Sequence, residues 1–210
     1  MRELGLCKRS SQAKGMVMTI TYTIGDSLYI NLTNRCRNDC NFCIRNLGDS
    51  VGGGDSLWLE REPSKEEVLT DILRMNLSQV REIVYCGYGE PTERLGDLLW
   101  ICRQLKQVEA PPIRLNTNGH ADLIAGCDTA PNFEGLVDTI SISLNAAGAQ
   151  EYYEMCRPVF GIGTYDAVLE FAVNVKKYVP HVILSIVGGT TDADACRRVA
   201  DELGIPLRVR

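Results

Sequence analysis

Long hydrophobic runs are missing from this sequence. The longest apolar runs, of which residues 182–187 are an example, are far shorter than the roughly 20 residues that a transmembrane helix needs. Residues 1–14 contain four basic and few apolar side chains, so they lack the apolar centre of a signal peptide. We therefore expect no membrane association and a cytoplasmic location.

An excess of positive charge is also missing. Lys and Arg number 22 and Asp and Glu number 27, which leaves a formal net charge of -5. Proteins that bind nucleic acids are usually basic on the binding face, because they neutralise phosphate groups. The composition therefore gives no indication of a nucleic-acid-binding surface.

Cysteine, by contrast, is abundant, with nine residues in a chain of 210. A secreted disulfide framework would be accompanied by a signal peptide, and complete pairing needs an even count; the sequence has neither. A reducing compartment, in which some thiolates bind metal, explains the count better. Cysteines that stand apart from the others are expected to be small buried hydrophobic residues, namely Cys86, Cys102, Cys127, Cys156 and Cys196.

Short runs rich in β-branched residues alternate with amphipathic segments after residue 25. The expected strands are residues 27–32, 82–85, 113–116, 139–144, 182–187 and 207–209. The expected helices are residues 64–75, 95–108, 165–178 and 191–204. This alternation predicts a parallel sheet with right-handed crossovers, as part of a barrel or as a doubly wound sheet. In either case functional groups should gather at the carboxyl ends of the strands.

The length suits one domain. We predict an α/β core domain over residues 25–210, preceded by an N-terminal extension over residues 1–24 that is partly disordered. Met16 or Met18 is an alternative start of the protein. A glycine-rich stretch around residues 52–54 is interpreted as a flexible surface loop, with a substrate-access loop as the alternative.

Three cysteines stand close together directly after the first expected strand. Cys36, Cys40 and Cys43 follow the spacing C-x3-C-x2-C. Iron–sulfur clusters select thiolate ligands, and three thiolates can hold three irons of a cubane while the fourth iron stays open. A structural zinc site is the competing interpretation, but zinc normally takes four ligands in short-spaced pairs. The two histidines, His120 and His181, belong to no such pair.

The cysteine motif, with the aromatic Phe42 before its last cysteine, resembles the signature of the radical S-adenosylmethionine superfamily. Residues 86–92, Cys-Gly-Tyr-Gly-Glu-Pro-Thr, are similar to the Gly-Gly-Glu-Pro segment of that family and also follow an expected strand. The resemblance covers residues 27–210 and implies a partial (βα)6 barrel of the TIM type.

The same resemblance implies the cofactors. The three cysteines would hold a [4Fe-4S] cluster whose open iron binds S-adenosylmethionine. An external donor such as a flavodoxin or ferredoxin would supply an electron. Cleavage of the cofactor would then give a 5′-deoxyadenosyl radical that abstracts a hydrogen atom from the substrate, so that the hard chemistry belongs to the cofactor.

Individual residues receive roles from the resemblance as well. Gly87 and Gly89 would let the backbone approach the cofactor closely, and Glu90 would accept from its ammonium group. Asn and Ser at strand ends also favour turns for local reasons, which is the alternative explanation for such positions. The remaining cofactor-contact candidates are Phe42, Tyr88, Pro91, Asn118, Ser143, Asn145 and Val187.

Within the superfamily, the sequence most resembles a group of small proteins associated with TatD-type nucleases. The likeness lies in residues 25–31, residues 34–36 and the Gly-Tyr-Gly-Glu-Pro-Thr-Glu variant at residues 87–93. A functional link to such a nuclease is therefore expected. Two other functions stay open: an activating enzyme that makes a glycyl radical on a partner protein, and a non-catalytic iron–sulfur or metal-binding protein.

The substrate cannot be recognised from the sequence. It should meet the open face of the barrel above the cluster. Polar residues expected at the rim of that face are Asp39, Arg45, Asn46, His120 and Arg157, although solvated surface positions or a helix start explain them as well.

Overall fold

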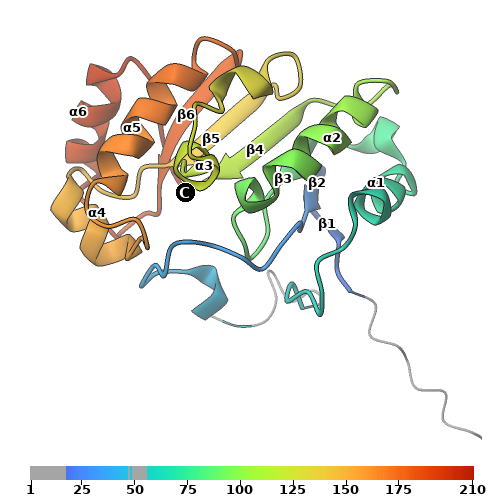
Figure 1. Cartoon of the computed structure of the whole chain (residues 1–210), viewed down its shortest axis with the longest axis horizontal. Coiled ribbons are helices and arrows are strands. Elements are labelled where there is room, and N and C mark those ends of the chain that lie inside the picture. The colour runs from blue at the N-terminus through green and yellow to red at the C-terminus, as the bar shows by residue number, and fades with distance from the viewer. Residues whose placement is uncertain (1–17, 47, 49–55) are drawn as a thin grey trace, which may run out of the picture.

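A seven-stranded sheet forms the centre of the molecule (Figure 1), and its strands lie side by side in the order of the sequence. The computed structural model describes residues 18–46, 48 and 56–210. β1 is antiparallel to β2, and all other neighbours are parallel. The strands are β1 Thr21–Ile24, β2 Ser27–Ile30, β3 Glu82–Tyr85, β4 Ile113–Thr117, β5 Thr139–Ser143, β6 His181–Ile186 and β7 Leu207–Val209.

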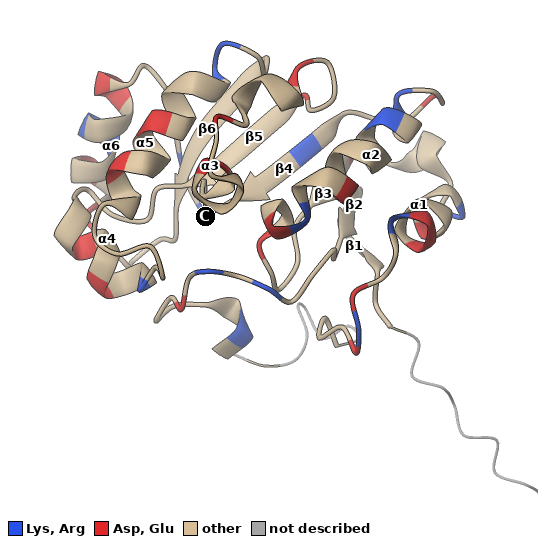
Figure 2. Ribbon diagram, viewed as in Figure 1, with Lys and Arg blue, Asp and Glu red and all other residues tan. Residues whose placement is uncertain are grey.

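Six α-helices of the described chain connect these strands, and acidic residues are spread over them (Figure 2). They are α1 Lys65–Leu73, α2 Leu95–Leu105, α3 Ala121–Ala125, α4 Ala149–Cys156, α5 Thr164–Val175 and α6 Ala193–Glu202. Short 3-10 helices are η1 Ile44–Asn46, η2 Leu77–Gln79, η3 Pro91–Arg94 and η4 Ala130–Phe133. In the part of the chain that is described, none of the helices has the length and apolar character needed to cross a membrane.

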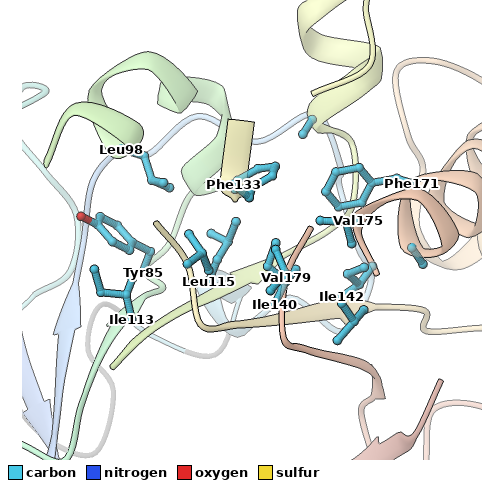
Figure 3. Close-up of a cluster of buried hydrophobic side chains, with 14 of the residues drawn as sticks. Tyr85, Leu98, Ile113, Leu115, Phe133, Ile140, Ile142, Phe171, Val175 and Val179 are labelled. Atoms are coloured by element: carbon cyan, nitrogen blue, oxygen red, sulfur yellow. The ribbon is translucent and has the colours of Figure 1, made fainter. Parts of the chain in front are cut away.

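The hydrophobic core lies between one face of the sheet and the helices that cover it (Figure 1). Alternate residues of each strand point to this face, because successive side chains of a strand alternate between the two faces. This core includes Ile113 and Leu115 of β4, Ile140 and Ile142 of β5 and Phe171 of α5 (Figure 3). This one-sided burial fixes the pairing register, since a slip by one residue would turn the apolar set away from the helices.

The opposite face of the sheet is more polar and encloses a cavity of about 210 Å³, here called the sheet cavity. Its walls include Tyr22 of β1, Tyr29 of β2, Arg114 of β4, Ser141 of β5 and Arg208 of β7. Strands from both edges of the sheet can border one cavity only if the sheet is curved. The predicted fold class, an α/β partial barrel of parallel strands, is therefore confirmed.

The six predicted strands are present, with ends shifted by up to two residues. The first strand of the sheet was not predicted, because residues 21–24 were assigned to the N-terminal extension. β1 pairs with β2 through a two-residue turn at Gly25 and Asp26, and a Gly-Asp pair between β-branched runs is a signal for a hairpin. Residues 1–17 of the expected extension and the glycine-rich stretch at residues 52–54 lie outside the described residues.

Four helices agree with the predicted segments, whereas α3 and α4 were not predicted. The start of α1 is the capping box expected from the sequence: Glu67 N donates to Ser64 Oγ at 3.1 Å, and Ser64 N donates to the Glu67 carboxylate at 2.7 Å. α3 and α4 are short, and their placement depends on contacts with distant segments rather than on a long apolar stripe.

Phe133→Ala is expected to lower the free energy of unfolding by about 3–5 kcal/mol, because the fully buried ring leaves a cavity. The Phe133 ring packs edge-on against Phe171 with centroids 6.2 Å apart, so little can collapse into the space. Urea denaturation measures the loss. The matched control Val173→Ala removes a side chain that is 40% exposed and should change stability by no more than about 0.5 kcal/mol. Equal losses in the two variants would contradict this assignment of the core.

Candidate active site

The predicted site residues follow five neighbouring strands at their carboxyl ends. Cys36 lies after β2, Glu90 after β3, Asn118 after β4, Asn145 after β5 and Val187 after β6. Because these strands are parallel, their carboxyl ends meet at one edge of the sheet. The structure therefore places the two motifs and the weaker candidates along one edge.

The cysteine loop, residues 31–46, leaves β2 and runs along this edge toward α4 (Figure 1). Its three motif cysteines are free thiols and are half-buried. Cys43 N donates to Cys40 O at 3.1 Å, and Asn46 N donates to Cys43 O at 2.9 Å, so the end of the motif is a tight turn that continues into η1. This turn keeps Cys40 and Cys43 on one short stretch of backbone.

Backbone hydrogen bonds to the end of α4 hold the middle of the cysteine loop. Asp39 N donates to Cys156 O at 2.9 Å, and Asn41 N donates to Met155 O at 3.0 Å. An exposed ion pair between Arg157 and Asp39, 3.6 Å apart, adds to them. Asp39 and Arg157, expected at the substrate rim, thus pair with each other.

Cys156 is a site neighbour that the sequence did not reveal. It is fully buried, as predicted for an isolated cysteine, but its thiol also contacts the thiol of Cys40. This hydrogen bond, together with burial, raises the pKa of Cys40, whereas the same bond lowers the pKa of Cys156. Asn145 Nδ2 lies 3.7 Å from Cys156 Sγ on the other side. The local sequence around Cys156 does not predict its contact with Cys40, because only the fold brings α4 next to the cysteine loop.

The two glycines after β3 are required by chain packing. A Cβ atom at Gly87 would lie 2.2 Å from Asn31 Oδ1, and one at Gly89 would lie 2.2 Å from the carbonyl oxygen of Thr33. Glu90 N donates to Arg35 O at 2.7 Å in the same contact. The sequence predicted close approach to a cofactor; the close approach in the described structure is to the cysteine loop.

Glu90 is a buried carboxylate that links the ends of β3 and β4. Its Oε1 accepts from Thr117 Oγ1 at 2.7 Å and from Thr92 Oγ1 and N at 2.7 and 3.0 Å. Its Oε2 accepts from Asn118 N at 2.7 Å. Burial raises the pKa of Glu90, and these hydrogen bonds oppose that rise. Among the described residues, Oε2 thus accepts one hydrogen bond and Oε1 accepts three.

Side-chain donors reach two of the three motif sulfurs. Asn118 Nδ2 lies 3.8 Å from Cys36 Sγ. Arg45 donates to the Cys43 thiol. Burial, the largest single cause, lowers the pKa of Arg45, but this bond and the charges of Cys43, Cys36 and Asp39 together raise it. Burial, with the nearby charge of Glu90, raises the pKa of Cys36 to about 12. Hydrogen bonds to sulfur favour the thiolate form that binds iron.

The donor set fits an iron–sulfur cubane. Among the described residues, no three His, Cys, Asp or Glu side chains converge closely enough to hold one metal ion. A cubane is larger than one ion, and each thiolate binds a different iron, so its ligands stand farther apart. Cys36, Cys40 and Cys43 meet this chemistry as three free thiols on one loop.

The other predicted cofactor residues lie in more local contacts. Tyr88 Oη donates to Gly48 O at 2.7 Å, and its ring packs edge-on against Trp58. Ser143 Oγ accepts from Arg210 Nη2 at 3.2 Å. Pro91 is the first residue of η3, and Phe42 packs against the core. Val187 O accepts from Thr190 Oγ1 at 2.8 Å, and within the described chain no hydrogen bond joins Val187 to the cysteine loop.

Comparison with protein families identifies the architecture. A family model described as the radical SAM superfamily matches residues 30–203, which is well over half of the chain. The chain belongs to this superfamily. The resemblance found in its two motifs is thereby confirmed at that level. No curated protein sequence matches the chain.

Several solved structures share the fold at low sequence identity. HydG, a maturase of the [FeFe]-hydrogenase, superposes with a TM-score of 0.61 and 16% identity over 86% of this chain and 41% of that chain. TYW1 with a lysine-pyruvate adduct superposes with a TM-score of 0.59 and 13% identity over 88% of this chain and 65% of that chain. Streptococcus suis SuiB bound to S-adenosylmethionine superposes with a TM-score of 0.56 and 20% identity over 86% of this chain and 37% of that chain. The chain thus spans less than two thirds of these proteins, and the likeness shows a common fold.

Asn38 of the cysteine loop, Tyr152 of α4 and His120, which directly precedes α3, form a buried series of hydrogen bonds. His120 Nε2 and Tyr152 Oη lie 2.9 Å apart, and Asn38 Nδ2 donates to the same hydroxyl at 3.4 Å. His120 has no exposed surface, so the expectation that it lies at the substrate rim is wrong. Burial lowers the pKa of His120 to about 4. This series connects the cysteine loop to α3 and α4.

Gly89→Ala should lower the free energy of unfolding by about 3 kcal/mol, because the added Cβ meets backbone atoms that cannot move aside cheaply. The matched control is Gly96→Ala in α2, where a Cβ would meet nothing within 4 Å and alanine favours the helix. Urea denaturation of both variants provides the comparison. A Gly89→Ala protein as stable as wild type would show that the β3 turn does not pack on the cysteine loop as described.

His120 should make the protein acid-sensitive. Its folded-state pKa of about 4 lies below the ordinary value of 6.5, so the unfolded chain binds the proton first as the pH falls. Its stabilising contribution is complete above about pH 6.5 and decreases toward pH 4. Between pH 7 and 4, wild type should lose about 3 kcal/mol more unfolding free energy than His120→Gln, as measured by urea denaturation.

The control for this acid effect is His181→Gln, which changes an exposed histidine of β6. Its pH profile should follow that of wild type. Parallel profiles for wild type and His120→Gln would mean that His120 is not buried as a neutral side chain.

Proposed function

We propose that this protein is a radical SAM enzyme that holds a [4Fe-4S] cluster on Cys36, Cys40 and Cys43. The observation that supports it most directly is the position of these three free thiols on one loop at the carboxyl edge of the sheet. The Gly-Tyr-Gly-Glu-Pro segment packs directly against that loop. Two motifs that are about 50 residues apart in sequence therefore form one contact, as a shared cofactor site requires.

When bound, the reduced cluster and S-adenosylmethionine supply a 5′-deoxyadenosyl radical for hydrogen abstraction from the substrate. The residues of this chain provide binding and orientation. Asn118 and Arg45 direct N–H groups at the motif sulfurs, and Glu90 offers an acceptor for the cofactor ammonium. Ser143, Asn145 and Val187 are proposed to line the cofactor on the far side of the edge, at the ends of β5 and β6.

Several finer assignments are supported by sequence motifs alone. Residues 25–31 and the Gly-Tyr-Gly-Glu-Pro-Thr-Glu variant support membership of the TatD-associated group and a functional link to such a nuclease. An electron donor such as flavodoxin or ferredoxin and a cytoplasmic location are proposed with it. Neighbouring genes and the metabolites that change in a deletion strain would test this group assignment and reveal the substrate.

Single Ala variants of Cys36, Cys40 and Cys43 should lose the cluster. Anaerobic wild-type protein is expected to contain about four irons and four sulfides, with the broad brown absorption of such clusters. Cys102→Ala, which changes a buried cysteine, and Cys127→Ala, which changes an exposed one, are the controls and should keep it. Cys156→Ala should also keep it, since Cys156 is a neighbour of Cys40 rather than a ligand. Iron and sulfide analysis measures each outcome.

Cofactor cleavage separates the enzyme from the non-catalytic alternative. Reduced, reconstituted protein should convert S-adenosylmethionine to methionine and 5′-deoxyadenosine, detected by chromatography. A partner-dependent glycyl radical signal would instead identify an activating enzyme. A protein that contains only tetrahedral zinc, or that leaves S-adenosylmethionine intact, would refute the proposed function.

A further inference from the structure

The polar face of the sheet carries basic residues that the cofactor site does not use. Arg114 of β4, Arg208 of β7 and Arg210 directly after β7 all line the sheet cavity. Figure 2 shows the basic segment on β4, within a sheet that otherwise carries few charges. In a protein with a net charge of -5, three arginines on one cavity are a local reversal of the overall charge.

The described residues of this cavity do not neutralise these charges. No Asp or Glu is among the described residues that line it. The nearest acidic partner is Glu82, whose Oε1 lies 3.3 Å from Arg114 Nη2 and 2.9 Å from Arg81 Nη2, so two arginines share one carboxylate. Arg114 is 13% exposed in its side chain, and its buried Nε has no hydrogen-bond partner among the described residues.

Arg210 adds a second donor group to the cavity. Its Nη2 donates to Ser143 Oγ at 3.2 Å, and no ion pair joins Arg208 or Arg210 to a carboxylate in the part of the chain that is described. Burial of the guanidinium is the main cause that lowers the pKa of Arg210; Cys86 opposes it, while Arg208 and Arg114 act with it. Arg208 and Arg210 thus face the cavity without a carboxylate partner among the described residues, and Arg114 shares its partner Glu82 with Arg81.

We propose that the sheet cavity is the substrate site and that Arg114, Arg208 and Arg210 bind an oxyanion of the substrate, a carboxylate or a phosphate. Guanidinium groups match both anions through paired N–H donors. The inference rests on the proposed function, because the cavity also borders Gly87 and Tyr88 of the cofactor segment. An anion held by the arginines would keep the rest of the substrate next to that segment.

The volume of the sheet cavity limits the size of the ligand that can enter it. The cavity measures about 210 Å³, which is below the roughly 300–1,000 Å³ of typical drug-sized pockets. A small acid or a phosphate-bearing end of a larger molecule fits this space. The tilted rings of Tyr22 and Tyr29, with centroids 5.2 Å apart, form a partly apolar part of the lining, and Tyr29 Oη accepts from Arg114 Nη2 at 3.5 Å.

The test uses the anaerobically reconstituted full chain with pyrophosphate and citrate as probes. Isothermal titration calorimetry at constant ionic strength, with and without S-adenosylmethionine, measures their dissociation constants. Wild type should bind at least one probe, and the stronger one distinguishes phosphate from carboxylate recognition. Arg114→Gln and the double variant Arg208→Gln/Arg210→Gln should each weaken binding about ten-fold or more. Arg74→Gln, which changes a side chain that is 74% exposed on the far end of α1, should bind as wild type does.

Three results of this titration would overturn the anion site. Absence of probe binding by wild type, or equal binding by all variants, overturns the anion site. Displacement of the probe by S-adenosylmethionine also overturns it, because the arginines would then belong to the cofactor carboxylate. Production of 5′-deoxyadenosine by the same wild-type sample tests the proposed function separately. The double variant keeps the ion pair between Arg114 and Glu82, so it remains informative if Arg114→Gln, which loses that pair, does not fold.

Discussion

The buried carboxylate of Glu90 is the interaction on which the arrangement of the active-site edge depends. A carboxylate without water is unfavourable unless hydrogen bonds replace its hydration, and four donors from η3 and the end of β4 do so here. The same residue donates its own N–H to Arg35 O in the cysteine loop. One side chain and its backbone thus connect three consecutive segments of the edge, and Asn118 extends the connection to Cys36.

Much of this architecture could be predicted because its signals are local. The alternation of β-branched runs with amphipathic segments predicted six strands and four helices, and the capping box at Ser64 predicted the start of α1. The cysteine motif and the Gly-Tyr-Gly-Glu-Pro segment each follow a strand, so parallel pairing was sufficient to place them on one edge. The family match and the curved sheet confirm the superfamily and the fold class.

The rest depends on contacts between segments that are distant in sequence. Gly87 and Gly89 were selected for close approach to a cofactor, but the atoms that exclude a side chain there belong to the cysteine loop. Cys156 was assigned to the core, and only the position of α4 shows its contact with Cys40. His120 was expected at the rim of the site because it follows the third predicted strand, whereas it is fully buried and its ring lies 2.9 Å from the hydroxyl of Tyr152. Tertiary packing overrides local preference in each case.

The sheet is an incomplete barrel over the described residues, since β1 pairs there only with β2 and β7 only with β6. Both outer strands nevertheless border one cavity, with Tyr22 and Ile24 on one side and Arg208 and Arg210 on the other. Among the described residues, the sheet therefore leaves two strand edges beside the cavity without a neighbouring strand, whereas a fully closed eight-stranded cylinder has no such edge.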